Sequence, residues 1–157
     1  MKILFISPPT DSAIKSVIGT TGPPLGLAYL ASIAREKGFD ARIVDSLAEN
    51  LTYYDVEKII RQYSPDIVGI TSTTSMIPDA YAVVRMAKNV TIIGGPHVTF
   101  IPELTLQESS EIDYIVKGEG EIAFSGILDI LTNKKEKKEV LGIAYRKGDR
   151  IMNNPPQ

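Results

Sequence analysis

The stretch Ile92-Ile93-Gly94-Gly95-Pro96-His97 decides the fold, together with an upstream counterpart, Ile67-Val68-Gly69-Ile70-Thr71-Ser72-Thr73-Thr74-Ser75. Each is a short apolar run that ends in small or polar residues. Apolar runs of about four to eight residues between turn signals are typical of parallel strands, which helices cover on both faces. The residues after each run then lie at the carboxyl edge of the sheet, where ligands bind in open α/β folds. The two stretches therefore predict a ligand site made of hydroxyl groups and exposed backbone.

Further apolar runs extend this pattern into a regular alternation of strands and helices. The expected strands cover residues 3–6, 40–45, 67–70, 90–93 and 114–116, and helical patterns lie between and after them. This alternation is typical of an α/β fold in which a helix joins each strand to the next. The sequence therefore predicts a doubly wound, flavodoxin-like sheet of five parallel strands in the order 2-1-3-4-5.

Two segments near the ends of the chain refine this prediction. Pro23-Pro24 opens a helix at its first turn, where a missing N–H does no harm. The side chains expected to face the core from this helix are Leu25, Ala28, Tyr29, Ala31, Ser32 and Ile33. Lys147-Gly148-Asp149 lies between two short apolar runs and predicts a C-terminal β-hairpin. We therefore expect a Rossmann-like binding domain over residues 1–139 and a hairpin and linker over residues 140–157.

Composition and charge exclude several classes of protein. The 157 residues suit one domain, and 43% hydrophobic residues with a formal net charge of −2 are typical of an ordinary globular chain. The lysine-rich run 134–138 is interrupted by Glu136, so no basic stripe indicates nucleic-acid binding. No membrane segment is expected, and the apolar run in residues 1–6 is too short for a signal peptide, which predicts a cytoplasmic location.

The chain contains no cysteine and one histidine. It therefore has no disulfide, no thiol nucleophile and no iron–sulfur cluster held by its own side chains. A metal site built from protein ligands alone is not expected either. Any redox or metal chemistry has to come with a cofactor.

Small residues end three neighbouring strands of the predicted sheet. Residues 71–75 follow the third strand, Gly94-Gly95 the fourth, and Gly118 and Gly120 the fifth. Gly94-Gly95 either permits a tight turn with positive φ or lets the backbone approach a flat ligand closely. Three strand ends without bulky side chains predict one large ligand.

Four other ligands found on such folds fit the sequence less well. No glycine-rich turn of the dinucleotide or Walker type follows the first strand, which disfavours NAD and ATP. Lys117 follows the fifth strand as in receiver domains, but Ser7 and Thr71 stand where their magnesium site needs acidic residues. Flavin binding is a weaker option, because no expected strand-end turn supplies an aromatic ring at its tip.

Four segments together indicate a family. They are Gly22-Pro23-Pro24-Leu25-Gly26-Leu27, Pro65-Asp66-Ile67-Val68-Gly69-Ile70-Thr71, Gly94-Gly95-Pro96-His97 and Asp113-Tyr114-Ile115-Val116-Lys117-Gly118-Glu119-Gly120-Glu121. With these segments in this order, nearly the whole chain resembles the cobalamin-binding domain at the amino terminus of cobalamin-dependent radical S-adenosylmethionine (SAM) enzymes. The closing hairpin and Pro155-Pro156 resemble the junction with the radical domain, whose three-cysteine motif is absent here.

The resemblance carries expectations about the cofactor and the parent enzyme. It implies that the chain is a corrinoid-binding fragment or module, not catalytic alone, that binds cobalamin at the carboxyl edge of the sheet. Its parent would be a methyltransferase or cyclase, with a C-terminal radical SAM domain in cis that binds a [4Fe-4S] cluster and S-adenosylmethionine. The candidate cofactor-binding residues are Thr10, Asp11, Thr71, Ser72, Thr73, Thr74, Gly94, Gly95, Pro96, His97, Gly118, Glu119 and Gly120.

One departure from related carriers concerns the cobalt atom. Carriers of the methionine synthase type place Asp-x-His-x-x-Gly after the first strand, and that histidine becomes the lower ligand of cobalt. Residues 11–16 read Asp-Ser-Ala-Ile-Lys-Ser, with Ala13 at the histidine position and Ser16 at the glycine position. The resemblance therefore implies a base-off corrinoid without a histidine lower ligand.

The remaining polar residues near these strand ends have plainer interpretations. His97 follows the fourth strand rather than the first, so we expect it to cap a helix or to bond the nucleotide tail or a corrin amide. Glu119 and Glu121 are expected to open a helix, where carboxylates favour the positive end of the dipole. The alternative function is a flavodoxin-like regulatory or protein-interaction module without a cofactor, in which the loop 10–22 contacts a partner.

Overall fold

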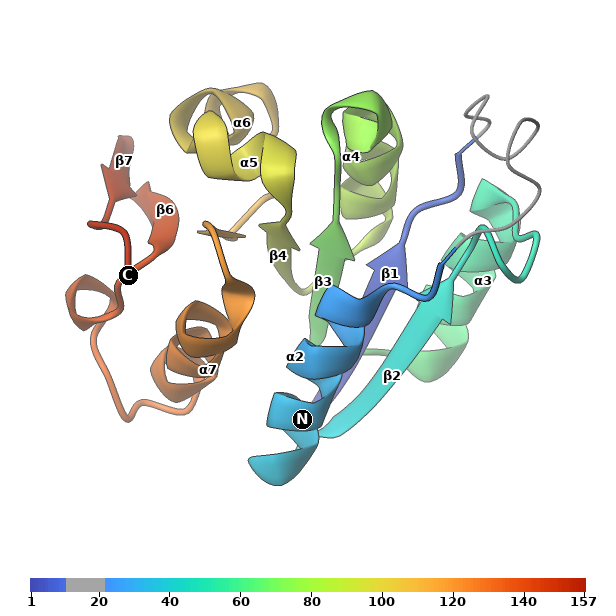
Figure 1. The fold of residues 1–157 in the computed structure, drawn as a ribbon, viewed down its shortest axis with the longest axis horizontal. Coiled ribbons are helices and arrows are strands. Elements are labelled where there is room, and N and C mark those ends of the chain that lie inside the picture. The colour runs from blue at the N-terminus through green and yellow to red at the C-terminus, as the bar shows by residue number, and fades with distance from the viewer. Residues whose placement is uncertain (11–21) are drawn as a thin grey trace.

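The computed structural model describes residues 1–10 and 22–157. A sheet in the order β2-β1-β3-β4-β5-β6-β7 crosses the molecule (Figure 1). Its strands are β1 (Lys2–Ser7), β2 (Asp40–Asp45), β3 (Ile67–Thr71), β4 (Val90–Gly94), β5 (Tyr114–Val116), β6 (Ile143–Lys147) and β7 (Arg150–Asn153). The first five are parallel, and β6 and β7 are antiparallel. The predicted fold class, the strand order 2-1-3-4-5 and the C-terminal hairpin are confirmed.

Helices cover both faces of this sheet. They are α2 (Leu25–Glu36), α3 (Tyr53–Tyr63), α4 (Ile77–Met86), α5 (Pro96–Phe100), α6 (Pro102–Glu108) and α7 (Gly120–Leu131), with short 3₁₀ turns η1 (Thr74–Met76) and η2 (Lys137–Glu139). Helices α2 and α7 pack on what we call the first face, against Phe5, Ile92 and Tyr114. Helices α3 to α6 pack on the second face, against Ile6, Ile70 and Ile93. Neighbouring residues of one strand thus belong to different cores, as the alternation of side chains requires.

Local signals explain where several helices begin and end. Thr52 and Asp55 form a capping box at the start of α3, in which each side chain bonds the backbone N–H of the other. Ser64 ends that helix in the left-handed region, with φ of 49°, directly before Pro65. Gly38 follows α2 in the left-handed region, with φ of 83°, a conformation in which glycine commonly follows the end of a helix.

The buried stripe predicted for α2 is wrong in part: Ala31 is buried and Ile33 packs on the core as expected, but the other predicted residues do not form the buried stripe. Leu27, Ala31 and Ala34 are the buried side chains of this helix, whereas Leu25 and Tyr29 are 62% and 61% exposed. Apolar residues occur on both sides of the helix, so two stripes fit the helical period equally well. Contact with α7 decides between them and leaves an apolar strip of α2 at the surface.

The C-terminal hairpin is tied to the edge of the sheet. Strand β6 pairs with β5, and the side-chain amide of buried Asn154 donates to the carbonyls of Lys137 and Val140 at 2.8 and 2.6 Å. The division between residues 139 and 140 stays a prediction, because β6 and β7 continue the same sheet. Among the described residues, no helix has the length and apolarity needed to cross a bilayer.

Candidate functional site

A cavity of about 360 Å³ opens at the carboxyl edge of the sheet, between the strands and helices α2 and α7. Its volume lies in the range of roughly 300–1,000 Å³ that is usual for small-molecule sites. The lining residues are Phe5, Ser7, Gly22, Pro24, Gly26, Leu27, Leu30, Gly69, Ile70, Thr71, Ile92, Gly94, Gly95, Val116, Gly118, Glu119, Gly120, Glu121 and Phe124. The cavity therefore lies at the edge where the sequence places the ligand.

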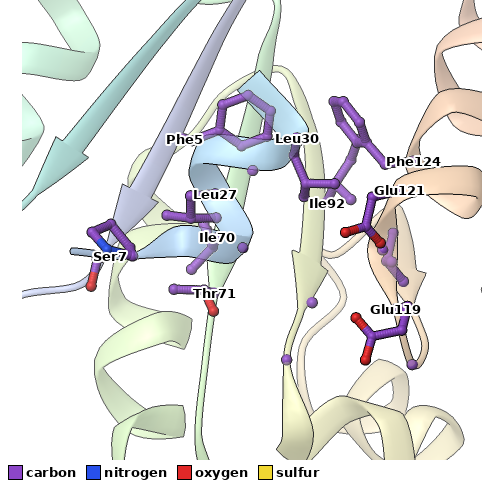
Figure 2. Close-up of a pocket in the computed structure, with 18 of the residues that line it drawn as sticks. Phe5, Ser7, Leu27, Leu30, Ile70, Thr71, Ile92, Glu119, Glu121 and Phe124 are labelled. Atoms are coloured by element: carbon purple, nitrogen blue, oxygen red, sulfur yellow. The ribbon is translucent and has the colours of Figure 1, made fainter. Parts of the chain in front are cut away.

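The cavity changes character along its length, as Figure 2 shows. At one end, which we call the inner end, lie the side chains of Phe5, Leu30, Ile92 and Phe124. At the other end, which we call the mouth, lie those of Ser7, Thr71 and Glu119, and the Glu121 side chain lies between the two ends, next to Phe124. An apolar interior with a few polar groups at the opening is typical of a binding site.

Small residues on the first face of the sheet create this space. Gly69 and Gly94 occupy first-face positions of β3 and β4, so no side chain projects there. A Cβ at Gly69 would lie 2.7 Å from Cδ1 of Phe5, so this glycine makes room for the aromatic ring. Among the described residues, a Cβ at Gly94 would meet only Val116, at ordinary contact distances of 3.7 Å or more. Gly94 is therefore not needed for packing within the protein, and its missing side chain leaves space in the cavity.

Gly95 has a different role from Gly94. Its φ is +117°, and a Cβ there would lie 2.3 Å from the carbonyl oxygen of Ser72. Both the backbone conformation and the close approach of the loop after β3 require glycine at this position. The two explanations offered by the sequence thus apply to different residues. Gly95 permits the turn, and Gly94 leaves the first face of the sheet without a side chain at that position.

Thr99 connects the two glycine loops at the mouth of the cavity. Its hydroxyl donates to the Gly95 carbonyl at 2.9 Å and accepts from the Gly118 N–H at 3.0 Å. Gly118 has φ of +66°, and a Cβ there would have no atom of residues 1–10 or 22–157 within 4 Å, apart from its chain neighbours. Sequence reasoning missed Thr99, because its second partner, Gly118, becomes a neighbour only when β4 and β5 pair.

The hydroxyl-rich turn after β3 lies partly beside the cavity. Thr71 lines it, whereas Ser72 is 1% exposed and its Oγ has no hydrogen-bond partner among the described residues. The hydroxyls of Thr73 and Ser75 lie 3.1 Å apart, and Thr74 Oγ1 lies 3.3 Å from Nδ1 of His97. This turn therefore connects the cavity to the loop that carries His97.

His97 lies in the short helix α5 and does not cap it, because the cap position is held by Gly95. Its Nδ1 faces Thr74 Oγ1, and its Nε2 is buried without a partner in the described part of the chain. His97 is not among the residues that line the cavity. One imidazole nitrogen of His97 is thus buried at the ends of β3 and β4 without a hydrogen-bond partner among the described residues.

Of the predicted site residues, the structure brings one subset together at the cavity. These are Thr71, Gly94, Gly95, Gly118, Glu119 and Gly120. A second subset lies at the same strand ends but outside the lining: Ser72, Thr73, Thr74, Pro96 and His97. Thr10 follows β1 and does not line the cavity, and Asp11 lies outside the described residues. None of these positions is tested for binding by the geometry alone, so their roles stay predictions.

The charges near the mouth come from carboxylates. Glu119 is the cap residue of α7 and Glu121 lies in its first turn, as expected from the sequence. Lys117 points elsewhere: its Nζ donates to the Asn154 carbonyl at 2.6 Å and to the side chain of Asn153. Burial lowers the pKa of Lys117, and the charge of Glu103 opposes that shift. Lys117 therefore anchors the hairpin.

The inner end of the cavity was not predicted as part of the site. Phe5 and Phe124 meet edge to face, with ring centroids 5.3 Å apart, and both are almost completely buried. The sequence indicates such residues as core, because a pocket wall and a core use the same side chains. The one available signal was Gly69, since a glycine inside a strand often marks a close approach.

Comparisons with known proteins agree with this geometry. Residues 12–128 match the family model described as the B12 binding domain. The chain is 54% identical, over its full length, to an uncharacterized methyltransferase of Pyrococcus horikoshii, of which it spans 35%. It is 34% identical over 95% of its length to the anaerobic magnesium-protoporphyrin IX monomethyl ester cyclase of Rubrivivax gelatinosus, of which it spans 28%. The chain thus spans about a third or less of these curated relatives.

Solved structures show the same fold. A structure of the cobalamin-dependent S-adenosylmethionine radical enzyme OxsB, with aqua-cobalamin and S-adenosylmethionine bound, superposes with a TM-score of 0.83 at 17% identity. This match covers 99% of the present chain and 22% of that protein. The radical S-adenosylmethionine methyltransferase TsrM from Kitasatospora setae, with cobalamin and a [4Fe-4S] cluster bound, gives 0.79 at 16% identity.

Proposed function

Because the chain belongs to the B12-binding domain family, we propose that it holds cobalamin at the carboxyl edge of its sheet, as the corrinoid-carrying part of a radical SAM enzyme. The observation that carries this proposal is the bare first face of the sheet at Gly94. There the chain leaves space that no packing contact within the protein requires.

The residues present fit a large, amide-rich ligand. Gly94 and Gly118 leave open volume at two neighbouring strand ends, and Thr71 offers a hydroxyl between them and β1. The buried Ser72 Oγ and His97 Nε2 have no partners among the described residues, and buried polar groups normally have one. We propose that polar groups of the cofactor bond these atoms.

We further propose that the nucleotide tail enters the cavity. The sheet floor, α2 and α7 enclose it on three sides, and apolar side chains line its inner end. The first turn of α7 carries backbone N–H groups without a side-chain cap, and Gly120 and Glu121 of this turn line the cavity. Such N–H groups are suited to acceptor oxygens of the ligand.

Cobalamin, when bound, supplies a cobalt atom that can carry and transfer a methyl group. The chain's own residues bind and orient the cofactor. Gly94 and Gly118 leave room for the corrin ring, the hydroxyl of Thr71 bonds a polar group at the edge of the ring, and the inner end of the cavity holds the nucleotide tail. We propose that the corrinoid is bound base-off and without a histidine on cobalt. In support, the only histidine of the chain faces Thr74 and lies outside the lining of the cavity.

The open mouth of the cavity suggests what covers the other side of the cofactor. Leu25 and Ile122 are 62% and 73% exposed, and they directly follow the lining residues Pro24 and Glu121. The relatives are much longer chains. We propose that a C-terminal radical SAM domain in cis packs over this apolar rim, where the two domains enclose the corrin between them.

A titration with hydroxocobalamin tests the proposed site. The purified chain is equilibrated with the corrinoid, desalted and examined by visible absorption. We expect retained corrinoid with a base-off spectrum. Retained corrinoid with a base-on spectrum would support the site but contradict the proposal that the corrinoid is bound base-off. The absence of saturable binding would contradict the proposed function.

Substitution of Gly94 locates the site on the sheet. In Gly94→Val, the new side chain enters the cavity, and a loss of about 2 kcal/mol weakens binding roughly thirtyfold. Arg42→Val, at an exposed position of the edge strand β2, is the matched control and should keep the affinity of the unchanged chain. Thermal unfolding without ligand checks that both variants fold. Unchanged affinity in a folded Gly94→Val would refute this site assignment.

A further inference from the structure

Residues 118–120, which we call the β5 loop, join strand β5 to the first turn of α7 at the mouth of the cavity. Gly118 and Gly120 flank Glu119, and all three residues line the cavity. Glycine loses more conformational freedom on ordering than any other residue, so a loop with two glycines is costly to hold in one place. The position of the β5 loop therefore depends on the residues that fasten its ends.

Lys117 fastens the start of the β5 loop with both its main chain and its side chain. Its N–H donates to the Gly142 carbonyl at 2.8 Å. Its Nζ donates to the Asn154 carbonyl at 2.6 Å and to the side-chain oxygen of Asn153. All three acceptors belong to residues 140–157, which we call the C-terminal segment. One residue thus attaches the loop to this segment at three points.

The acceptors of Lys117 are themselves held in place. Asn154 is buried, its N–H donates to the Ile143 carbonyl at 3.0 Å, and its side-chain amide donates to two further carbonyls. The side-chain amide of Asn153 donates to Oε1 of Glu103 in α6 at 3.2 Å. Helix α6 and strand β7 lie side by side in Figure 1. The C-terminal segment is therefore a fixed support rather than a second loose loop.

The charge of Lys117 strengthens this attachment. Burial lowers the pKa of Lys117, and the charge of Glu103 opposes that shift. The Asn153 amide connects the two charges, because it accepts from the ammonium group and donates to the carboxylate. Hydrogen bonds with an ionised donor or acceptor are roughly twice as strong as bonds between neutral groups. A neutral side chain at position 117 would lose this connection.

From these contacts we propose that Lys117 is a positioning residue for corrinoid binding, an inference that rests on the proposed function. By fastening the β5 loop to the C-terminal segment, Lys117 places Gly118 and Glu119 before the ligand arrives. If the loop were loose, binding would have to order it, and ordering the backbone of one residue weakens binding by about tenfold. The C-terminal segment thus supports the site although residues 140–157 do not line the cavity.

Lys117→Met tests the proposal, because methionine keeps an unbranched side chain and removes the ammonium group. Equilibrium dialysis of the full chain with hydroxocobalamin gives the Kd. We expect the variant to bind about tenfold more weakly than the unchanged chain. Lys88→Met, at an exposed position after α4, is the matched control and should keep the affinity. Unchanged affinity in a folded Lys117→Met would overturn the proposal.

Hydrogen exchange without ligand separates positioning of the loop from a general loss of stability. The Gly118 N–H donates to Thr99 Oγ1, so its exchange rate reports the position of the β5 loop. In Lys117→Met we expect this rate to rise about tenfold, while the amides of β3 and β4 keep their protection. An equal rise at Gly118 and in these central strands would overturn the positioning role, because it would indicate destabilisation of the whole chain.

A double-variant cycle with Asn153 tests the route of the effect. Asn153→Ala removes the side-chain acceptor, and we expect it to weaken hydroxocobalamin binding about threefold. The double variant Lys117→Met/Asn153→Ala should bind no more weakly than Lys117→Met alone, because the shared bond can be lost only once. Losses that multiply in the double variant would contradict the link through Asn153.

Failure of the inference can be told from failure of the proposed function. If the unchanged chain binds hydroxocobalamin and Lys117→Met binds it equally well, the inference is overturned and the corrinoid site remains. If the unchanged chain does not bind the corrinoid, the proposed function fails and the inference falls with it.

Discussion

The two faces of the sheet differ most at its carboxyl edge, although the same strands build both. On the second face Ile6, Ile70 and Ile93 are almost completely buried under α3 to α6, although Ile70 also borders the cavity. On the first face the next residues along the same strands are Ser7, Thr71 and Gly94, and they line a cavity. A residue that packs in the second-face core and a residue that lines the cavity are thus neighbours in the sequence, because successive side chains of a strand point to opposite faces. Stability and ligand binding can therefore be changed separately at adjacent positions.

The largest effect on stability is expected from Ile93→Ala on the second face. Ile93 is 0% exposed, and removing its side chain leaves a cavity that costs about 3 kcal/mol of unfolding free energy. Urea unfolding measures this loss, and Ile93→Val should lose about 1 kcal/mol. Corrinoid affinity under native conditions should hardly change. A large fall in affinity would show that the two faces are not independent.

A smaller loss of stability is expected from Gly95→Ala. The alanine has to accept a φ of +117° and a Cβ that would lie 2.3 Å from the Ser72 carbonyl oxygen. Backbone strain of this kind costs about 2 kcal/mol, which urea unfolding also measures. Gly94→Ala is the matched control, because its Cβ meets Val116 at 3.7 Å and its stability should stay within about 0.5 kcal/mol of the unchanged chain. Equal losses in the two variants would contradict the division of roles between these glycines.

The smallest effect is expected from Thr99→Val, which keeps the shape of the side chain and removes its hydroxyl. The bonds to Gly95 and Gly118 are lost, and the unfolding free energy should fall by about 1 kcal/mol. We expect corrinoid affinity to fall a few-fold, because both glycine loops border the cavity. Thr99→Ser retains the hydroxyl and should retain most of the affinity. Full affinity in Thr99→Val would show that the link does not support binding.

The sequence predicts the sheet well and the cavity only in part. Buried parallel strands are continuous apolar runs between turn residues, so their positions and order follow from the pattern. The register of α2 does not, because Leu25 and Tyr29 form a second apolar stripe that only contact with α7 distinguishes. Phe124 looks like core in any sequence pattern, and the bond between Thr99 and Gly118 joins residues that are distant along the chain. The features that could be predicted depend on residues close together in the sequence. The features that were missed depend on how distant segments of the chain meet.

The link through Thr99 has a consequence for the thermodynamics of binding. Since one hydroxyl joins the loop after β4 to the loop after β5, the two loops lose their freedom together when the chain folds. A ligand that arrives later finds both sides already placed and does not have to order them. Association with such a preorganised site retains more of its contact energy as affinity.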